Sequence, residues 1–526
     1  MELKLRTKNK LIFFIEYFWL FFLLLLASMV YLNQEFINLF FNSDELIPPI
    51  FFNDLFFKYG HYKDWIFSPV PHFFPDMLVT FPIFCIVKNV YFCFLIIIWI
   101  MMVSTYFAVK FIFHRLFSLE KSVIFSLTAV SSLFLLALKN FSPYNRALVP
   151  FYHIGEFIVG LFFIGMQLNL ISKDKFSYKS YILCFFIVII VFACSLSDLL
   201  FVIQFAVPTF ITYSFFFLKK EIKLSSYLLL SSIVIFPAIS GALLTKYLMP
   251  KDILANYLSH PSLMKVSFST LNLQLVALIH VVKNSSNYLI KIIFSIFYLN
   301  LIFILGANLF ISHRVNIKNS IDKNIFLCAF IFLSVFLSLS SQLFLATPVY
   351  VNNRYLAPLF FFPILFFPIL FSPPILLFNN KLLASKIFTC LATLLFLCII
   401  VNLFLLISKP GFKLNKNYYP SYVRCIDKAL RGYGHTGIAQ YWDANLISVL
   451  SKENVEALPV IDLYPFFWGV NVSKFKKPIS FVVLDVINVP LSLNKNVIYR
   501  SYGIPDKIVI CDKKEIRIYS KNLKLN

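Results

Sequence analysis

Two adjacent carboxylates, Asp44 and Glu45, lie about a dozen residues after the first apolar run that is long enough to cross a bilayer. A carboxylate held at a membrane surface can take a proton from a hydroxyl group, or it can help to hold a divalent metal. An acidic pair in a loop is usually only a solvated feature. The chain has just 24 acidic residues among its 526, however, so this pair is a candidate for chemistry.

The acidic pair begins a segment, residues 33–90, that carries further side chains able to bind a substrate or a metal. We expect His61 and Asp64 of this segment to bind substrate. The spacing of His61 and His72 fits no zinc motif, so no dedicated transition-metal site is predicted. Whether the acids hold Mg²⁺ or Mn²⁺ stays open.

The second candidate site is a segment, residues 352–358, in which Arg354 and Tyr355 precede a proline that begins an apolar run. Arginine suits phosphate because its planar fork of N–H donors binds two oxygens and stays charged. We therefore expect Arg354 and Tyr355 to bind a phosphate group. An arginine that contacts lipid headgroups is the open alternative.

Two more residues are candidates for substrate binding. Asp198 lies between two apolar runs, where an acid is costly unless it is paired or faces water. A tight-turn aspartate is the alternative there. Arg146 belongs to a group with His153 and Glu156 at the start of another apolar run, and a structural Arg146–Glu156 pair is its alternative.

The composition is that of a membrane protein. The chain is 60% hydrophobic and 13% charged, with a mean hydropathy of +0.82, whereas soluble domains are about half apolar and about a quarter charged. A helix needs about 20 apolar residues to span the hydrocarbon core. We predict an α-helical polytopic membrane protein with about eleven spans, at 11–32, 91–109, 122–138, 153–171, 181–195, 200–218, 225–247, 288–312, 324–345, 357–378 and 387–407.

The positions of the basic residues predict the orientation. Lys and Arg gather at the N-terminus and in the short loops between alternate spans, and such loops stay in the cytoplasm. With the N-terminus inside, an odd number of spans places the tail outside. The net charge of +23 then reflects orientation, and we expect membrane lipids but no nucleic acid as partners.

Three segments on the outer side are longer than simple connections. The segments 33–90 and 248–287 contain apolar pieces, 77–87 and 266–282, that we interpret as interfacial helices. A pair of miscounted spans is the alternative. The tail, 408–526, has no run long enough to span.

For the tail we predict a small extracytoplasmic α/β domain. A helix is expected at 420–431 and strands near 435–441, 457–463, 479–485, 507–511 and 515–520, the last two forming a hairpin. Cys425 and Cys511 can form a disulfide if the tail is outside the cytoplasm. Tyr441-Trp442-Asp443 can stack on a sugar, although such residues more often pack a small core.

These features resemble the GT-C superfamily of membrane glycosyltransferases, which use polyprenyl-linked sugar donors. Its members have many spans, an acidic motif in the first outer loop, interfacial helices there and often an outer C-terminal domain. Asp44-Glu45-Leu46 matches the Asp-Glu-x form of that motif. The resemblance divides the chain into a transmembrane domain, 1–407, and a soluble domain, 408–526.

The resemblance implies an inverting glycosyltransferase in a bacterial inner membrane. Its donor would be a polyprenyl-phosphate-linked sugar, and its acceptor a glycan, lipid or protein of the cell envelope on the outer face. Asp44 would be the catalytic acid or base, with Glu45 assisting it in proton transfer or metal binding. Each predicted inside loop is too short to build a nucleotide-sugar domain.

Two other classes stay open. A flippase or another transporter of lipid-linked saccharides shares the many spans, but internal repeats and paired broken helices are not evident in the sequence. An O-antigen polymerase or ligase is also a sugar transferase, but it typically carries its key residues in a late outer loop. In this chain the acids lie in the first.

Overall fold

The computed structural model describes most of the chain, and the statements below refer to this part of it. The predicted outer segment 248–287 is described only at 248 and 268–284, and residue 352 lies outside the described residues. The described residues are 2–58, 60–68, 70–151, 153–171, 176–248, 268–284, 288–311, 322–344, 353–371, 381–487 and 493–525.

The protein is a polytopic helical membrane protein. Eight helices among the described residues are long and apolar enough to cross a membrane. They lie in α1 (Glu2–Leu32), α4 (Val90–Leu116), α5 (Leu119–Leu138), α7 (Tyr178–Ser197), the consecutive α8 (Leu199–Phe201), η5 (Val202–Ala206) and α9 (Val207–Leu218), then α10 (Leu224–Leu248), α14 (Lys323–Phe344) and α16 (Lys381–Ile407).

The three remaining predicted spans correspond to apolar helices that are not among these eight. Pro363 lies inside α15, and proline interrupts helical hydrogen bonding. These helices are α6 (Ile154–Leu170), α13 (Tyr288–Ile311) and α15 (Ala357–Phe366), the last between η6 (Asn353–Leu356) and η7 (Phe367–Phe371).

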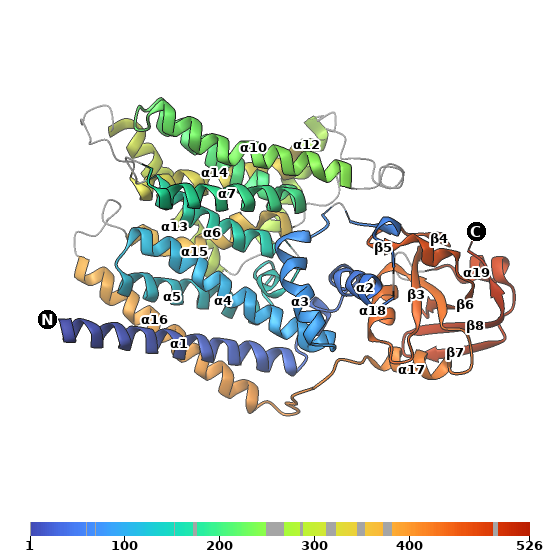
Figure 1. The fold of residues 1–526 in the computed structure, drawn as a ribbon. Helices are drawn as coiled ribbons and strands as arrows, with labels where there is room; N and C mark the ends of the chain where they lie inside the picture. Colours follow the sequence, from blue (N-terminus) through green and yellow to red (C-terminus); the bar gives the residue numbers. More distant parts are fainter. Residues whose placement is uncertain are drawn as a thin grey trace.

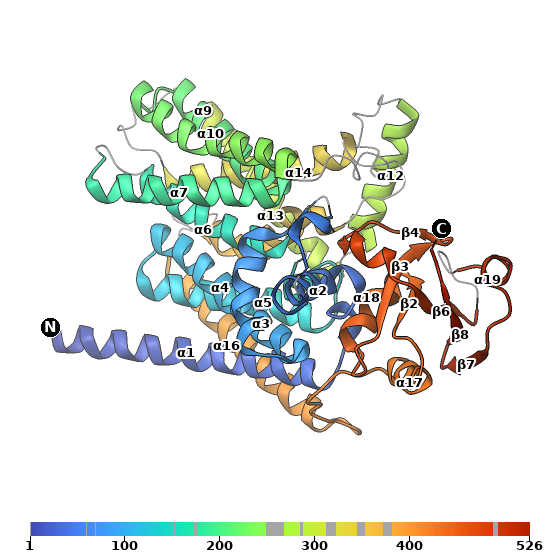
Figure 2. The same ribbon diagram turned by 45° about the vertical axis from the view of Figure 1, so that its right-hand side comes forward.

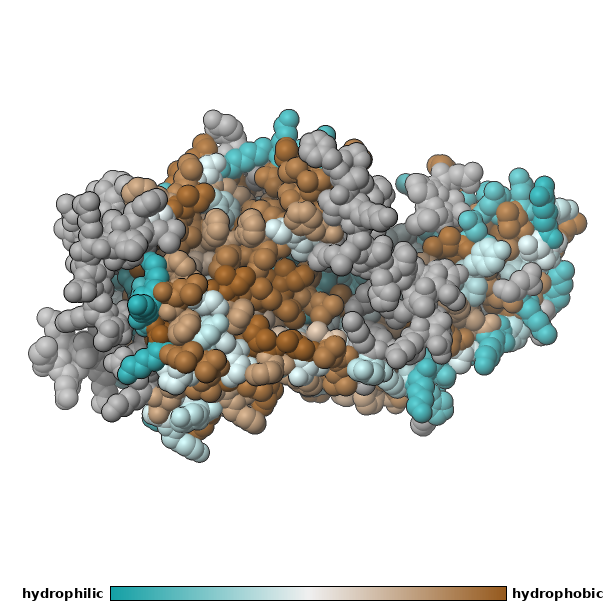
Figure 3. Space-filling model, turned by 90° about the horizontal axis from the view of Figure 1, so that it is seen from above, coloured by the Kyte–Doolittle hydropathy of each residue, from teal (hydrophilic) through white to brown (hydrophobic). Residues whose placement is uncertain are grey.

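The apolar helices form one bundle with roughly parallel axes, and the N-terminus lies at the end of the bundle farthest from the C-terminal sheet (Figure 1). The first and last spans, α1 and α16, pack against each other, and α7 packs along α10. In the rotated view of Figure 2, α1 still lies beside α16 and α7 still lies beside α10. The face in Figure 3 is apolar over the bundle and polar over the C-terminal region.

The acid inside the first span has a structural partner. Glu16 is buried and accepts a 2.5 Å hydrogen bond from Lys110 of α4. A few residues along α1, the indole of Trp19 donates to Ser131 of α5. A buried charge needs such a partner in a low-dielectric environment, so this pair joins α1 to α4.

The first loop, residues 33–90, is largely helical. It contains η1 (Ile37–Leu39), α2 (Ser43–Phe57), η2 (Tyr62–Asp64), the short strand β1 (Trp65–Ile66), η3 (Phe73–Met77) and α3 (Leu78–Ile86). A helix was expected at 77–87, and α3 confirms that element. Another was expected at 266–282, where α12 (Phe268–Asn284) lies.

The C-terminal region, residues 408–526, contains a six-stranded sheet in the order β4-β3-β2-β6-β8-β7. Strands β2, β3 and β6 are parallel, and the other neighbours are antiparallel. The β7–β8 pair confirms the predicted hairpin. The strands are β2 (Thr436–Gln440), β3 (Glu456–Ile461), β4 (Tyr464–Pro465), β6 (Ile479–Asp485), β7 (Lys507–Cys511) and β8 (Lys514–Leu523).

Three helices accompany the sheet: α17 (Ser421–Ala429), α18 (Tyr441–Leu450) and α19 (Lys495–Tyr502). Apolar side chains of α17 and α18 pack in one cluster with residues of the strands. Cys425 of α17 and Cys511 of β7 form a disulfide that closes an 86-residue separation.

The C-terminal region is docked on the first loop, which lies between it and the bundle in Figure 1. Strand β1 of the loop pairs with β5 (Val470–Asn471) of the C-terminal region. Asp54 of α2 accepts hydrogen bonds from Trp65 and Asn471 at 2.8 and 2.6 Å and pairs with Lys474 at 3.0 Å. Two segments more than 400 residues apart thus share one buried acid.

Candidate functional site

Helix α2 places Asp44 and Glu45 in its first turn. The side chain of Asn42 accepts hydrogen bonds from the backbone N–H groups of Asp44 and Glu45, at 3.1 and 3.3 Å, which caps the helix at this point. The two carboxylates then diverge. Asp44 lines an open cavity, whereas Glu45 is completely buried.

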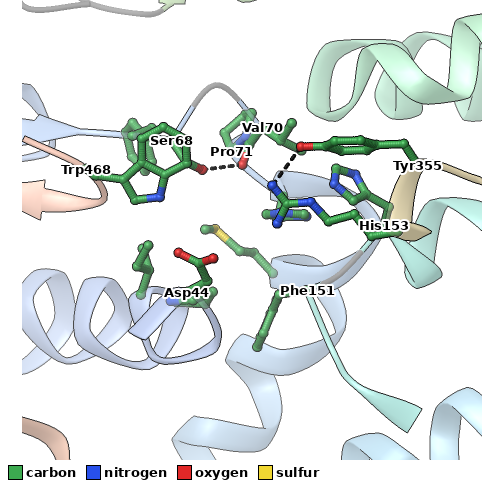
Figure 4. Close-up of a pocket in the computed structure, with 14 residues that line it drawn as sticks. Asp44, Ser68, Val70, Pro71, Phe151, His153, Tyr355 and Trp468 are labelled. Carbon is green, nitrogen blue, oxygen red and sulfur yellow. Dashed lines mark hydrogen bonds between the residues drawn. The ribbon is translucent and has the colours of Figure 1, made fainter. Parts of the chain in front are cut away.

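The cavity lies where the first loop, the bundle and the C-terminal region meet. It is open to solvent and encloses about 660 Å³ of empty space when the open mouth is included. The Asp44 carboxylate points into it, with Trp468 on one side and His153 and Tyr355 on the other (Figure 4). Arg354 also lines it.

The Arg354 side chain lies against its neighbour Tyr355. The guanidinium carbon lies 4.8 Å from the centroid of the Tyr355 ring, and Nη2 donates a 2.7 Å hydrogen bond to the tyrosine hydroxyl. Gln204 in turn donates to the backbone oxygen of Tyr355 at 2.9 Å. The structure therefore brings Asp44 and Arg354, two residues predicted to act, to the same cavity.

The C-terminal region supplies one wall and one polar contact. The hydroxyl of Tyr441 donates a hydrogen bond to Oδ1 of Asp44. Ser43 Oγ donates to the backbone oxygen of Tyr441, and Asn445 donates to that of Ser43 at 3.0 Å. Burial, and then the charge of Asp44, raises the pKa of Tyr441 well above its ordinary value, so the phenol remains a hydrogen-bond donor.

Of the three tail residues expected to contact a sugar, Tyr441 alone approaches the cavity by reaching Asp44. Trp442 does not line the cavity and is 46% exposed. Asp443 pairs with Lys514 at 2.5 Å, within the C-terminal region. The aromatic residue of the C-terminal region that lines the cavity is Trp468.

Beside the cavity, three side chains from two parts of the chain form a buried cluster: His72, Asp76 and Glu156. His72 Nδ1 lies 3.3 Å from Asp76 Oδ2 and 3.8 Å from Glu156 Oε1. Burial alone would lower the pKa of His72, but the two carboxylates raise it to about 10. A structural pair of Glu156 with Arg146 was the alternative interpretation, but the structure places Glu156 beside His72.

Glu45 adds a further carboxylate to this buried environment. Burial is the largest effect on its pKa, followed by the charge of Asp44, and together they raise the pKa well above its ordinary value. His72 and Arg146 act in the opposite direction but more weakly. This shift of the pKa favours the protonated form of Glu45.

Asp198 acts through a second histidine. It pairs with His153 Nδ1 at 2.5 Å and accepts a hydrogen bond from the backbone of Leu200 at 2.8 Å. Asp198 is therefore a turn aspartate, as the alternative interpretation held, and it also orients His153. Both His72 and His153 adopt left-handed backbone conformations, which are uncommon for non-glycine residues and cluster at functional sites.

The structure leaves the other predicted substrate-binding residues outside the cavity lining. His61 is exposed, and Asp64 lies in η2 on the same part of the loop; neither lines the cavity. Arg146 does not line it either, but its charge acts on Glu45. Local sequence spacing carries no signal for Trp468 or for the approach of Glu156 to His72.

The cavity combines groups that suit transfer chemistry. Asp44 can accept a proton, Arg354 can bind an anion, and the ring of Trp468 offers a surface on which a sugar can stack. Comparison of the chain with protein-family models, with curated proteins and with solved structures found no match.

Proposed function

We propose that this protein is an inverting membrane glycosyltransferase of the GT-C type. Its donor is a sugar linked to polyprenyl phosphate, and its acceptor is a hydroxyl-bearing glycan, lipid or protein of the cell envelope. The catalytic residue is Asp44, and Arg354 and Tyr355 bind the donor phosphate.

The observation that carries this proposal is that Asp44 and Arg354 line one cavity although they come from opposite parts of the chain. A transferase needs a base near the acceptor and a cation near the leaving group at the same time. Asp44 supplies the base and Arg354 supplies the cation at the same cavity.

In the proposed reaction, the acceptor oxygen attacks the anomeric carbon on the face opposite the phosphate. The new carbon–oxygen bond forms as the bond to phosphate breaks, which inverts the configuration. Polyprenyl phosphate leaves with the electron pair of that bond, and Arg354 stabilises its charge. The acceptor proton passes to Asp44, whose Oδ1 is already engaged by Tyr441.

The arrangement of the chain supports an outer-face reaction in a bacterial inner membrane. The Lys and Arg bias predicts an inside N-terminus, and the C-terminal sheet lies at the opposite end of the bundle (Figure 1). The disulfide between Cys425 and Cys511 fits an oxidising compartment.

The transporter alternative receives less support. Glu16 was the acid within a span that could have served ion coupling, and its pair with Lys110 accounts for it structurally. The polymerase and ligase alternative places its key residues in a large late outer loop, whereas Asp44, the proposed base, lies in the first loop.

The decisive test is transfer by Asp44→Asn in membrane extracts with radiolabelled polyprenyl-phosphate sugars as donors. We expect a loss of about 100-fold or more, since positioned general bases contribute about 10²–10⁴-fold. Asp462→Asn is the matched control, because Asp462 is an exposed loop acid of the C-terminal region. Normal transfer by well-expressed Asp44→Asn would exclude Asp44 as the base.

A further inference from the structure

We propose that His72, Asp76 and Glu156 form a binding site for a divalent transition-metal cation of the Zn²⁺ or Mn²⁺ type. The residues come from η3 of the first loop and from the first turn of α6. The site does not depend on the proposed transfer reaction, because it is defined by these side chains alone.

The spacing of the ligand atoms suits a metal. One atom from each side chain lies within 4.8 Å of the other two, and the two distances from His72 Nδ1 are 3.3 and 3.8 Å. Ligands about 2.1 Å from a tetrahedral metal lie about 3.4 Å from one another. A cation fits among the three with small side-chain adjustments.

The carboxylates also lack sufficient protein partners. Asp76 and Glu156 are 8% and 2% exposed. Within the described residues, Asp76 Oδ2 and both side-chain oxygens of Glu156 have no hydrogen-bond partner, apart from the approach of His72 Nδ1 to Asp76 Oδ2 and Glu156 Oε1. Unsatisfied buried carboxylates are costly. Glu45, fully buried and likewise without a hydrogen-bond partner on either oxygen, lies within electrostatic reach of His72 and Asp76.

The backbone of α6 is shaped to admit Asp76. A Cβ atom at Gly155 would lie 2.1 Å from Asp76 Oδ1, which is too close for any side chain. The missing side chain at Gly155 lets Asp76 lie directly against the residue that precedes Glu156. The two carboxylates are thereby held together despite their charge, and a cation between them offsets the repulsion.

The ligand types select the metal class. Imidazole suits Zn²⁺ and other transition metals, whereas Mg²⁺ and Ca²⁺ favour oxygen ligands alone. One histidine with two carboxylates is the ligand set of a Zn²⁺ or Mn²⁺ site. His72 also lines the cavity beside Asp44, so the metal would lie in the cavity wall.

The test is metal analysis of the full chain, purified in detergent with a tag that contains no histidine. The protein is stripped with a chelator and then titrated with Zn²⁺, Mn²⁺ or Mg²⁺ without any substrate. We expect one Zn²⁺ or Mn²⁺ per chain, with Mg²⁺ bound far more weakly. Mn²⁺-loaded protein should show nitrogen coupling in pulsed electron paramagnetic resonance, and His72→Gln should remove it.

Glu156→Gln should weaken binding by about 100-fold or more, since loss even of a supporting residue costs about 10–100-fold. Glu16→Gln is the matched control, because Glu16 is a buried, paired glutamate elsewhere in the bundle. Size-exclusion profiles establish that each variant is folded. Gly155→Ala keeps all three ligand residues but places a Cβ atom against Asp76 Oδ1, so it should also weaken binding.

Two results would overturn the proposal. If the wild-type protein binds neither Zn²⁺ nor Mn²⁺ stoichiometrically, the cluster is an imidazolium–carboxylate group. If the ions bind equally well to Glu156→Gln, the binding is adventitious. Asp44→Asn should keep the metal while losing transfer. A failure of the transferase proposal would therefore leave the metal result intact.

Discussion

The hydroxyl of Tyr441 donates a hydrogen bond to Oδ1 of Asp44, across a sequence separation of 397 residues. The C-terminal region therefore does more than cover the bundle. It presents a polar group to the carboxylate that we propose as the base, and the backbone contacts between Ser43 and α18 hold the two segments in register.

Tyr441→Phe should therefore reduce transfer while leaving the fold intact. The ring keeps its edge contact with Phe466, whose centroid lies 4.9 Å away. A hydrogen bond to a charged group contributes about 1.5–3 kcal/mol, so we expect a loss of about 10- to 100-fold.

The control for Tyr441→Phe is Tyr499→Phe, which alters an exposed tyrosine of α19. Transfer assays with the two variants measure the effect. Equal transfer by the two variants would mean that Tyr441 only packs against α2.

Arg354→Lys should impair donor binding although it retains the charge. The guanidinium both stacks on the Tyr355 ring and donates to its hydroxyl, and lysine cannot reproduce this planar geometry. We expect the KM for the polyprenyl-phosphate sugar to rise by about tenfold, the equivalent of about 1.4 kcal/mol, with a larger loss for Arg354→Gln. Donor titration measures it, with Arg431→Lys on the surface as the control.

Acid should loosen the docking of the C-terminal region on the first loop. Burial raises the pKa of Asp54, but Lys474 and hydrogen bonds from Asn471 and Trp65 outweigh it and lower the pKa below its ordinary value. The stabilisation is thus complete above the unfolded pKa of about 3.9 and is lost as the pH falls through the folded pKa. Protease sensitivity between pH 7 and pH 3 measures this loss.

Asp54→Asn should remove much of that pH dependence. Breaking a buried ion pair costs about 3–5 kcal/mol; we expect the low end, because Lys474 keeps a second partner in Glu456 at 3.1 Å. Thermal unfolding in detergent compares this variant with Asp462→Asn. Equal midpoints and equal acid sensitivity in the two variants would contradict the role of Asp54.

Loss of the disulfide should destabilise the C-terminal region selectively. In the chain-entropy model, closing a loop of this length contributes about 4–5 kcal/mol for the 86-residue separation between Cys425 and Cys511. Cys425→Ser should lower the unfolding midpoint, and Cys85→Ser, at an exposed free cysteine, should not. Mass spectrometry after alkylation establishes the pairing; two free thiols in protein isolated without reductant would refute it.

Much of the fold can be predicted because hydrocarbon thickness dictates the length of an apolar run. The spans and the β7–β8 hairpin follow from such local patterns. Helix α2 was not predicted, since Pro48 and Pro49 lie within it and proline argues against a helix interior. Its formation depends on the Asn42 cap and on packing against the C-terminal region.

The site could be predicted only in part. Asp44 and Arg354 became candidates because an acid after a span and an arginine before one have local signatures, and the structure places both at one cavity. The contacts of Tyr441, Trp468 and Glu156 arise from tertiary packing, and no residue near any of them in sequence indicates its partner. The two-residue strands β1 and β5 are likewise too short to leave an alternating pattern.

The junction between α1 and the segment after α16 has a consequence for assembly. Leu32 and Asn33 accept hydrogen bonds from the backbone of Asn415 and Lys413, and Lys409 pairs with Glu35. Once the first and last spans have met, the segments that lead to Asp44 and Tyr441 begin next to each other. The entropic cost of closing a loop grows with its length. The contact between the spans therefore lowers the entropic cost of bringing Asp44 and Tyr441 together.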